Sequence, residues 1–564
     1  MDDPWKSIDQ PAGKNDEKKQ RDIIDEARER GDEAIKDAEK NITEDNDEYY
    51  YTFDYKDIII KRLNTFTGTM FEVKGSLTLG DANNSINFDG NKKIVKANGG
   101  NDGSFFNVNG GTLVLNNGVI ANGETSENDY NSPIRVKENG TFIMNGGRIT
   151  ANKTKANPTV PYNAGAVDVS RGGHFIMNNG MIDHNISASG AVFVGNDGAN
   201  NSKILNEDKD FAIFDFKGGS IISNKSKGYN LAGGITIFPT GKLNITDGIV
   251  ANNYAGNKAG GIMVSDQYVP EFSNSINHSY SETVKKPYDD YVKKNKAEAN
   301  FDGGLLYKNE SGYAGGAVFV DSNHVHFNKT MILDNKAAKF GGGVYVGFPP
   351  RVQELENILI TENETFRSGL INENDDAWGG PLVGGGIWNC PDGYIHLGDG
   401  HSVYVFNNKG AMGGADYVFA KKTYSFELNG TDIHNQFYTF ISPVTKEKHI
   451  IKFLNDSGKG TLLPRNMSYS DQFIYLKAIY DEALQKEAWK NSGTFIMGNT
   501  ASYGAGLGSD ASMKSNQDDG DVEFKFKKHW DEDIDEDEYR WLNIHADIYI
   551  VPEDVDEVYG PRRC

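Results

Sequence analysis

Short runs in which apolar and polar residues alternate recur along most of the chain, and whole phrases recur with them. Gly-Thr-Phe-Ile-Met-Asn-Gly-Gly starts at Gly140, and Gly-His-Phe-Ile-Met-Asn-Asn-Gly starts at Gly173. Related phrases start at Gly111, Ala212 and Gly241, so the five starts lie 29, 33, 39 and 29 residues apart. Alternation with a period near two over about four residues predicts β-strands.

A second phrase follows most copies: two small residues, usually Gly-Gly or Gly-Ala, and then a β-branched run. Gly315 begins Gly-Gly-Ala-Val-Phe-Val, and Gly341 begins Gly-Gly-Gly-Val-Tyr-Val. One such unit cannot bury its own inner face, but a stack of units can. We therefore expect a parallel β-helix with one coil per repeat, in which corner asparagines stack as hydrogen-bonded ladders. A set of β-sandwiches is the alternative, but it predicts turns at about 8–12-residue spacing and no recurring phrases.

The residues expected to point inward occupy equivalent positions of these phrases. They are Phe142, Met144, Ile149, Phe175, Met177, Ile182, Leu243, Ile245, Val344 and Val346.

These phrases resemble those of pectate-lyase-like right-handed β-helix proteins, and more narrowly the β-helix regions of large surface adhesins from Gram-positive anaerobes. The Gly-Gly-Ala-Val signature is also similar to that of chlamydial polymorphic surface proteins. The resemblance covers residues 64–510 and implies an all-β fold, a right-handed, single-stranded parallel β-helix or solenoid. Insertions are expected at 265–312 and 417–491. Because this fold carries both lyases and adhesins, the resemblance specifies the fold and not the activity.

The N-terminal part has a different composition. Residues 1–48 contain a charged stretch from Asp16 to Ile42 that predicts a helix with a narrow apolar stripe. We interpret it as a stalk or linker, because no sustained heptad appears. Aromatic and isoleucine residues at 49–63 predict an N-terminal cap for the open end of the solenoid.

The second insertion also departs from the repeat. Residues 472–490 have apolar positions at helical spacing, which predicts a helix over the lateral face or the end of the solenoid. The β-helix is expected to resume at Gly493-Thr494-Phe495-Ile496-Met497.

The C-terminal part consists of a polar linker at 511–521 and a short module at 522–564. Its phrase Lys527-Lys528-His529-Trp530-Asp531 resembles the start of the B-type repeat of collagen adhesins. Only the first two strands are present, so we expect a truncated module. The resemblance implies Lys527 and Lys528 as candidates for an intramolecular isopeptide bond. We recognise no signal peptide and no sorting signal, and expect a fragment of a longer surface protein.

The charge balance excludes several classes of partner. The chain has 58 basic and 80 acidic side chains, and 58 − 80 gives −22. Such a chain repels phosphate backbones and anionic lipid, so nucleic acid and bare membrane are poor partners. No apolar run reaches the length of a membrane-spanning helix. The only cysteines are Cys390 and Cys564, which excludes a disulfide scaffold.

Catalytic motifs of pectin-degrading enzymes are not found. The acidic pairs Asp289-Asp290 and Asp375-Asp376 lie in expected loops, and the segments that place carboxylates for hydrolysis are missing. Arg135 and Arg148 lie on coils, without an evident acidic cluster one coil away. We interpret Asp183-His184-Asn185 as an outward polar turn and expect no catalytic residue.

Metal and cofactor motifs are equally weak. His324 and His326 can share one strand face, but no third ligand is near in the sequence. The acidic runs 518–521 and 531–538 are interpreted as solvated linkers. No phosphate-binding or dinucleotide fingerprint precedes a helix. We therefore expect no metal and no cofactor.

The first insertion, 265–312, is the strongest candidate for recognition. Insertions in solenoids become loops on one face, and tyrosine-rich loops suit binding. The basic residues Lys285, Lys286, Lys293, Lys294 and Lys296 favour an acidic ligand such as a sulfated or sialylated glycan. A solvated spacer loop is the alternative. The candidate binding residues are Tyr268, Tyr280, Tyr288, Tyr291, Lys285, Lys286, Lys293 and Lys294.

These features together favour an extracellular, non-catalytic protein. We expect a monomeric cell-surface adhesin, or a surface-displayed spacer, that binds a host glycan or an extracellular matrix protein. The alternative is a polysaccharide lyase or glycoside hydrolase of the same fold.

Overall fold

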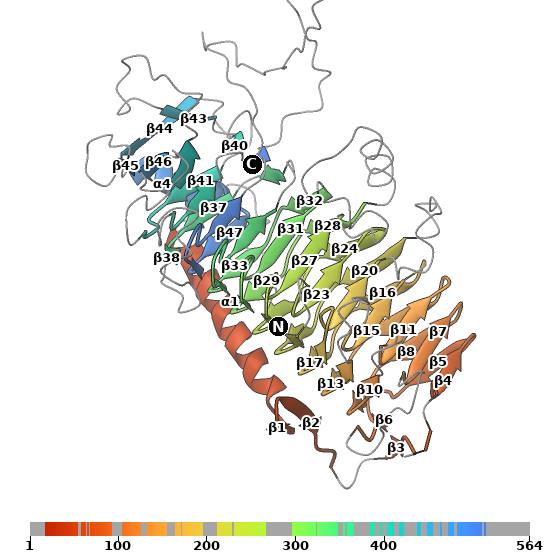
Figure 1. Cartoon of the computed structure of the whole chain (residues 1–564). Helices are drawn as coiled ribbons and strands as arrows, with labels where there is room; N and C mark the ends of the chain where they lie inside the picture. The colour runs from red at the N-terminus through yellow and green to blue at the C-terminus, as the bar shows by residue number, and fades with distance from the viewer. Residues whose placement is uncertain are drawn as a thin grey trace, which may run out of the picture.

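The chain folds into a parallel β-helix, as the repeated phrases predict (Figure 1). One coil consists of β11 (Ile134–Lys137), β12 (Thr141–Met144), β13 (Arg148–Thr150) and β14 (Lys153–Thr154), and the next begins with β15 (Val167–Val169). Equivalent strands of successive coils pair in parallel. Among the described residues these strands belong to four long sheets of 16, 11, 12 and 9 strands, which we name by their strand numbers. The 16-stranded sheet continues beyond the coils with strands that pair in antiparallel fashion.

The structure, a computed structural model, describes part of the chain. The described residues are 17–54, 58–63, 65–66, 68–92, 104–125, 132–154, 164–170, 172–195, 211–227, 231–266, 296–322, 324–347, 353–355, 358–365, 384–389, 395–396, 403–410, 417–421, 437–441, 448–454, 463–464, 472–478, 482–509 and 513–514.

The inner side of the coils is the hydrophobic core. In β12, inward Phe142 and Met144 are fully buried and alternate with partly exposed residues. Phe142 stacks on Phe175 at 4.9 Å between ring centroids, and Phe175 stacks on Phe214 at 4.5 Å. All ten residues predicted to point inward are at most 2% exposed, so that prediction is confirmed.

A ladder of buried asparagines follows one corner of the solenoid, and the predicted corner ladder is thereby confirmed. In each step the side-chain Nδ2 donates to Oδ1 of the next asparagine at 2.9 or 3.0 Å. Each side chain also satisfies corner carbonyls: Asn224 Nδ2 donates to Ile182 O and Ile222 O. The ladder runs through Asn152, Asn185, Asn224, Asn253, Asn309, Asn335, Asn499, Asn363 and Asn408.

The last coil occupies a position out of sequence order. β47 (Thr494–Met497), β48 (Thr500–Ala501) and β49 (Leu507–Ser509) confirm that the solenoid resumes near Gly493. This coil lies between the coil of β33 (Met331–Leu333) and that of β37 (Ile358–Thr361). The returning chain therefore fills a slot between two coils made earlier.

The N-terminal helix is present, but its interpretation as a stalk or linker is wrong. α1 (Glu17–Ala38) lies lengthwise along the 12-stranded sheet (Figure 1). Its apolar stripe, which includes Ile23, Ile24 and Ala27, packs against outward-facing side chains of that sheet. Those side chains are unusually apolar for the outside of a solenoid, and they supply the surface that the stripe buries.

The first predicted insertion is shorter than its bounds 265–312. β28 (Glu298–Phe301), β29 (Leu305–Tyr307) and β30 (Glu310–Ser311) are regular coil strands that pair with the coils before and after them. The connection between β27 (Ile262–Ser265) and β28 contains residues 267–295, which lie outside the described residues.

The second predicted insertion is partly strand. β42 (Tyr417–Lys421) pairs in parallel with β39 (Ile387–Asn389), and β46 (Gln472–Ala478) then pairs with β42 in antiparallel fashion. The helix predicted over 472–490 is therefore wrong for its first part, where Gln-Phe-Ile-Tyr-Leu-Lys-Ala alternates as a strand. α4 (Glu482–Asn491) confirms its second part.

The aromatic stretch at 49–51 does not cap the solenoid end. β2 (Glu48–Tyr51) forms a hairpin with β1 (Ile42–Asp45), and Tyr51 N donates to Asn122 Oδ1 on the flank of the coils. The first solenoid strand is β3 (Ile59–Lys61), which pairs with β6 (Asn87–Asp89).

We predict that Asn224→Ala lowers the free energy of unfolding by about 2–4 kcal/mol, because it leaves several buried backbone and amide groups without partners. Chemical denaturation measures this. Asn145→Ala is the matched control, since Asn145 belongs to an exposed asparagine pair with Asn116, and it should cost less than about 0.5 kcal/mol. Equal losses in both variants would contradict the role of the buried ladder.

Candidate functional site

The sequence-predicted binding residues lie outside the described residues. This holds for the four tyrosines and four lysines of the first insertion and for the isopeptide candidates Lys527 and Lys528. The binding hypothesis for the insertion therefore stays a prediction.

Tyr307, which the sequence places in the same insertion, has another role. It lies on β29 beneath α1, and its hydroxyl donates to Asp32 Oδ1 at 3.1 Å. The Tyr307 ring packs directly on Gly31 of the helix, where a Cβ atom would lie 2.4 Å from ring atom Cδ1. Gly31 is thus the point at which the helix backbone approaches the sheet most closely.

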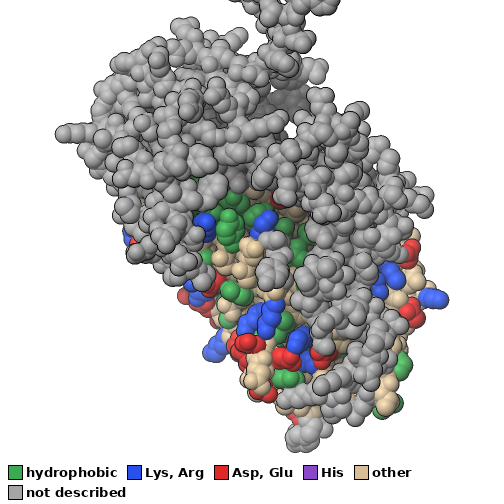
Figure 2. Space-filling model, viewed as in Figure 1, with side chains coloured by type: hydrophobic (Ala, Val, Ile, Leu, Met, Phe, Trp, Pro, Cys, Tyr) green, Lys and Arg blue, Asp and Glu red, His purple; other side chains and the backbone are tan. Residues whose placement is uncertain are grey.

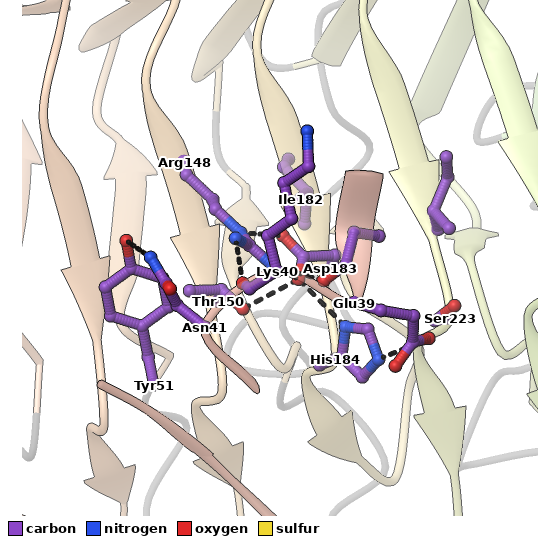
Figure 3. A network of polar contacts seen from close by, with 12 residues as sticks. Glu39, Lys40, Asn41, Tyr51, Arg148, Thr150, Ile182, Asp183, His184 and Ser223 are labelled. Carbon is purple, nitrogen blue, oxygen red and sulfur yellow. Dashed lines mark hydrogen bonds and ion pairs between the residues drawn. The ribbon is translucent and has the colours of Figure 1, made fainter. Parts of the chain in front are cut away.

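A polar network that includes the buried Asp183 and His184 lies where α1 ends (Figure 3). Arg148 on β13 forms a two-pronged ion pair with Asp183 on β17 (Met181–Asp183), with Nε–Oδ1 at 2.8 Å and Nη2–Oδ2 at 2.6 Å. Thr150 Oγ1 also donates to Asp183 Oδ2 at 2.8 Å. Arg148 further donates to the carbonyl groups of Ala38 and Lys40. One guanidinium therefore joins two coils and the C-terminal end of α1.

His184 extends this network, and the interpretation of 183–185 as an outward turn is wrong. Asp183, His184 and Asn185 are all at most 2% exposed, because the end of α1 covers the first two and the ladder contains the third. His184 Nδ1 lies 2.9 Å from Asp183 Oδ2, and Nε2 lies 3.2 Å from Glu39 Oε1. Each ring nitrogen of His184 therefore faces a carboxylate, one on the solenoid and one just after α1.

The β1–β2 hairpin continues the contact along the flank. Tyr49 packs edge-on against His184 at 4.7 Å, and Lys225 Nζ lies 4.6 Å from the centre of the Tyr49 ring. Lys225 also pairs with Glu44 at 3.0 Å. We call residues 17–51, comprising α1 and the hairpin, the N-terminal clasp. It contacts the solenoid from the coil of Glu362, through Arg21, back to the coil of Lys92, through Tyr49.

The clasp network is arranged for attachment and not for proton transfer to a substrate. General acid–base catalysis needs a group within reach of the substrate proton. Here both oxygens of Asp183 already accept hydrogen bonds from Arg148, one also from Thr150, and both His184 nitrogens face carboxylates. The Asp–His pair thus resembles a catalytic dyad in sequence but holds the helix end in place.

The charged residues on the outer faces also form pairs between adjacent coils. Arg135 Nε lies 3.7 Å from Asp168 Oδ2 one coil away, and His174 Nε2 lies 3.0 Å from Asp215 Oδ2. The hydrogen bond from His174 lowers the pKa of Asp215, and a second from Asn244 acts in the same direction. Figure 2 shows positive and negative side chains interspersed over the described part of one face.

Metal-binding groups do not converge in the part of the chain that the structure describes: no three His, Cys, Asp or Glu side chains lie close enough to hold an ion. His324 and His326 lie on the outer side of β32 (His324–Phe327), as the strand period predicts. Among the described helices, none is long and apolar enough to cross a membrane.

The sequence contains a signal for the clasp network that only the coil register reveals. Arg148 and Asp183 occupy strand positions two apart in consecutive phrases, so they lie diagonally on paired strands. The partners Glu39 and Lys40 are more than 100 residues away and belong to no repeat. Pairwise comparison of phrases can therefore find the ion pair but not the helix that it holds.

The fold and this network define a parallel β-helix solenoid with an N-terminal clasp. No protein-family model, no curated protein and no solved structure matches this chain.

We predict that Gly31→Ala weakens the docking of α1, although the same change in an isolated helix stabilises it by about 1 kcal/mol. The added methyl group overlaps the Tyr307 ring, and overpacking of this kind costs about 1–3 kcal/mol. Hydrogen exchange of the α1 amides should become faster. Glu33→Ala, on the exposed side of the helix, is the control and should leave exchange unchanged; faster exchange in both would rule out the proposed contact.

Arg148→Met should lower the free energy of unfolding by about 3 kcal/mol, because it leaves the buried Asp183 carboxylate without its cation. Thermal denaturation and α1 hydrogen exchange measure the effect. Lys308→Met removes an exposed ion pair with Asp32 and should cost less than about 1 kcal/mol. If the two variants lose the same stability, the Arg148 contact is no more than a surface ion pair.

The lowered pKa of Asp215 predicts a pH dependence at the acidic end. Its stabilising contribution is complete above the ordinary carboxyl pKa of 3.8 and is lost as the pH falls through the lower folded-state value. Asp215→Asn should therefore show a shallower loss of stability below about pH 4 than the parent protein. Unfolding free energies measured between neutral pH and pH 2 test this; identical slopes would contradict it.

Proposed function

We propose that this chain is a non-catalytic, surface-displayed adhesin that binds a host glycan or matrix protein from the side of its 16-stranded sheet. The observation that carries the proposal is the position of the variable connections. Two long connections, 196–210 and 267–295, lead from the 16-stranded sheet to the 11-stranded sheet. Two others, 155–163 and 366–383, lead from the nine-stranded sheet to the 16-stranded sheet. The connections elsewhere in these coils are short and nearly constant.

The 12-stranded and 16-stranded sheets thus differ in what borders their outer faces. The 12-stranded sheet is covered by the clasp, and its outward side chains are used in that contact. The 16-stranded sheet lies between the connections that vary in length. Binding residues are concentrated on loops held by a rigid scaffold, and this side offers that arrangement.

The outer surface of the 16-stranded sheet is also aromatic. Phe319, Tyr345 and Trp388 occupy the middle positions of their strands, which point outward, and are at most 5% exposed. Phe319 and Tyr345 lie 5.2 Å apart, and Lys258 Nζ lies 4.5 Å from the centre of the Phe319 ring. Because these rings are buried against one another, they form a second hydrophobic layer that stiffens this side of the solenoid, and the contacts with a ligand are expected from the connections beside it.

The sequence phrases and the charge support the cellular location and the ligand class. The resemblance to Gram-positive surface adhesins and the start of a B-type repeat support an extracellular, cell-wall-attached protein. The basic residues of 267–295 favour an acidic glycan. A polysaccharide lyase or glycoside hydrolase is the competing function, and the saturated Asp183–His184 pair gives it no support.

A glycan and matrix-protein array, paired with a product-detecting screen on pectins, host glycans and mucin, tests this function. We expect binding without turnover. Replacing 267–295 by a short Gly/Ser loop should abolish binding and preserve the fold, because loop length has a small effect on stability. The control is a variant in which the connection 397–402, between β40 (Ile395–His396) of the 11-stranded sheet and β41 (Val403–Phe406) of the 12-stranded sheet, is replaced in the same way, because it does not border the 16-stranded sheet. Turnover that one carboxylate substitution abolishes would refute the proposal, and unchanged binding by the first variant would refute the site.

A further inference from the structure

One end of the solenoid has a concentration of exposed apolar side chains. This end, residues 58–79, contains β3, β4 (Phe71–Val73) and β5 (Ser76–Leu79), and we call it the tip. Ile58 is 77% exposed and Leu63 is 72% exposed. Among the described residues, four of the six exposed large apolar side chains lie here, namely Ile58, Ile60, Leu63 and Phe66. Clusters of this kind mark interaction sites.

The tip also presents three open sheet edges. β3, β4 and β5 are the terminal strands of the 12-, 16- and 11-stranded sheets. Within the described chain each pairs on one side only, with β6, β7 (Phe106–Asn109) and β8 (Thr112–Leu115) respectively. Their other sides present backbone donors and acceptors. Proteins that avoid pairing at such edges use proline, bulges or a covering segment, and residues 58–79 contain no proline.

The opposite end of the solenoid is built differently (Figure 1). There β46 pairs with β42 in antiparallel fashion and extends the 16-stranded sheet beyond the coils. α1 enters the solenoid at that end, where Arg21 pairs with Glu362, and β50 (Met513–Lys514) leaves from it beside β40 (Ile395–His396). Neither Glu17 nor Lys514, the first and last described residues, lies at the tip, and the strands at the opposite end block head-to-tail stacking.

The charge distribution favours contact at the tip. Residues 58–92 contain four basic and three acidic side chains, and 4 − 3 gives +1, while the whole chain carries −22. Exposed charges act over about 8–10 Å at physiological salt. Two copies therefore repel each other along their flanks but not where their tips meet.

The geometry points to the tip as a homophilic docking surface that takes the tip of a second copy of this chain. A two-fold axis perpendicular to the solenoid turns the edge strands of one copy antiparallel to those of the other. Antiparallel pairing satisfies the open edges and is at least as stable per residue as the parallel pairing inside each copy. The same axis brings the exposed apolar side chains of the two tips together, as an isologous interface requires. The proposed dimer differs from the monomer that the sequence analysis expects, and the experiment below distinguishes the two.

The use of this contact rests on the proposed function. If each chain is attached to a surface at the end where α1 enters and β50 leaves, the tip points away from that surface. Two tips then meet between opposing surfaces, and the partner of this adhesin is another copy of itself.

Sedimentation equilibrium and small-angle scattering of the full chain test the docking without any assumption about function. We expect a concentration-dependent dimer, detectable by about 0.5 mM chain because small interfaces associate weakly. Its maximum dimension should be nearly twice that of the monomer. Leu63→Glu and Ile58→Glu should each raise the dissociation constant at least about tenfold, since each buries a charge at an apolar contact.

Tyr254→Glu is the matched control, because Tyr254 is an exposed aromatic residue on the nine-stranded sheet, far along the solenoid from the tip. It should leave association unchanged, and circular dichroism should show that all three variants are folded. A chain that stays monomeric, a dimer with side-by-side dimensions, or a dimer that both tip variants leave intact would overturn the proposal.

Beads that carry the chain through its C-terminal end test the adhesive use separately. Aggregation that Leu63→Glu abolishes supports tip docking between surfaces. If the chain dimerises in solution but the beads do not aggregate, the tip docking is supported and the adhesive function is contradicted. The two experiments therefore distinguish a failure of the docking surface from a failure of the proposed function.

Discussion

The buried asparagine ladder is the interaction on which the register of the whole solenoid depends. Each asparagine donates to a carbonyl group of the preceding coil in the stack, and several also donate to one of their own coil, so a coil that shifts by one residue loses several buried hydrogen bonds together. The constraint is visible in the sequence. Phe142 precedes Asn152 by ten residues, and the same interval separates Phe175 from Asn185 and Phe214 from Asn224. Variation in length is confined to the segments outside this interval.

That constancy explains why the fold is predictable from the sequence and why some elements are not. The recurring phrases determine strand positions, inward residues and the ladder, because each depends on contacts between neighbouring coils. The clasp depends on contacts between a non-repeated helix and single outward positions such as Leu305, Met331 and Phe495. From a single sequence, these outward residues cannot be distinguished from the inward residues of the core. The sequence therefore predicts a stalk for the charged helix and a loop for the segment that contains Tyr307.

The candidate site shows the same division. Arg148, Asp183 and His184 can be singled out from the sequence as possible catalytic groups, yet their chemistry depends on which groups surround them. The carbonyl groups at the end of α1 and the Glu39 carboxylate occupy the places where a substrate would have to lie. A buried ion pair contributes little net stability, but it penalises any alternative placement strongly. Arg148 therefore specifies where the helix ends on an apolar strip that would otherwise tolerate sliding.

The order of the coils also restricts the order in which parts of the chain can form their contacts during folding. The coil of residues 494–509 separates β33 from β37, so both of those strands have an open edge until the returning chain arrives. α1 is synthesised first, but it packs against Trp489 of α4 and Phe495 of the returning coil, which come late in the chain. The helix can thus reach its full set of contacts only after the returning coil is in place. Loop closure over such separations is slow compared with pairing of adjacent coils. The clasp is for this reason a late element of the fold, and it secures the one coil that the sequential stacking of repeats does not supply.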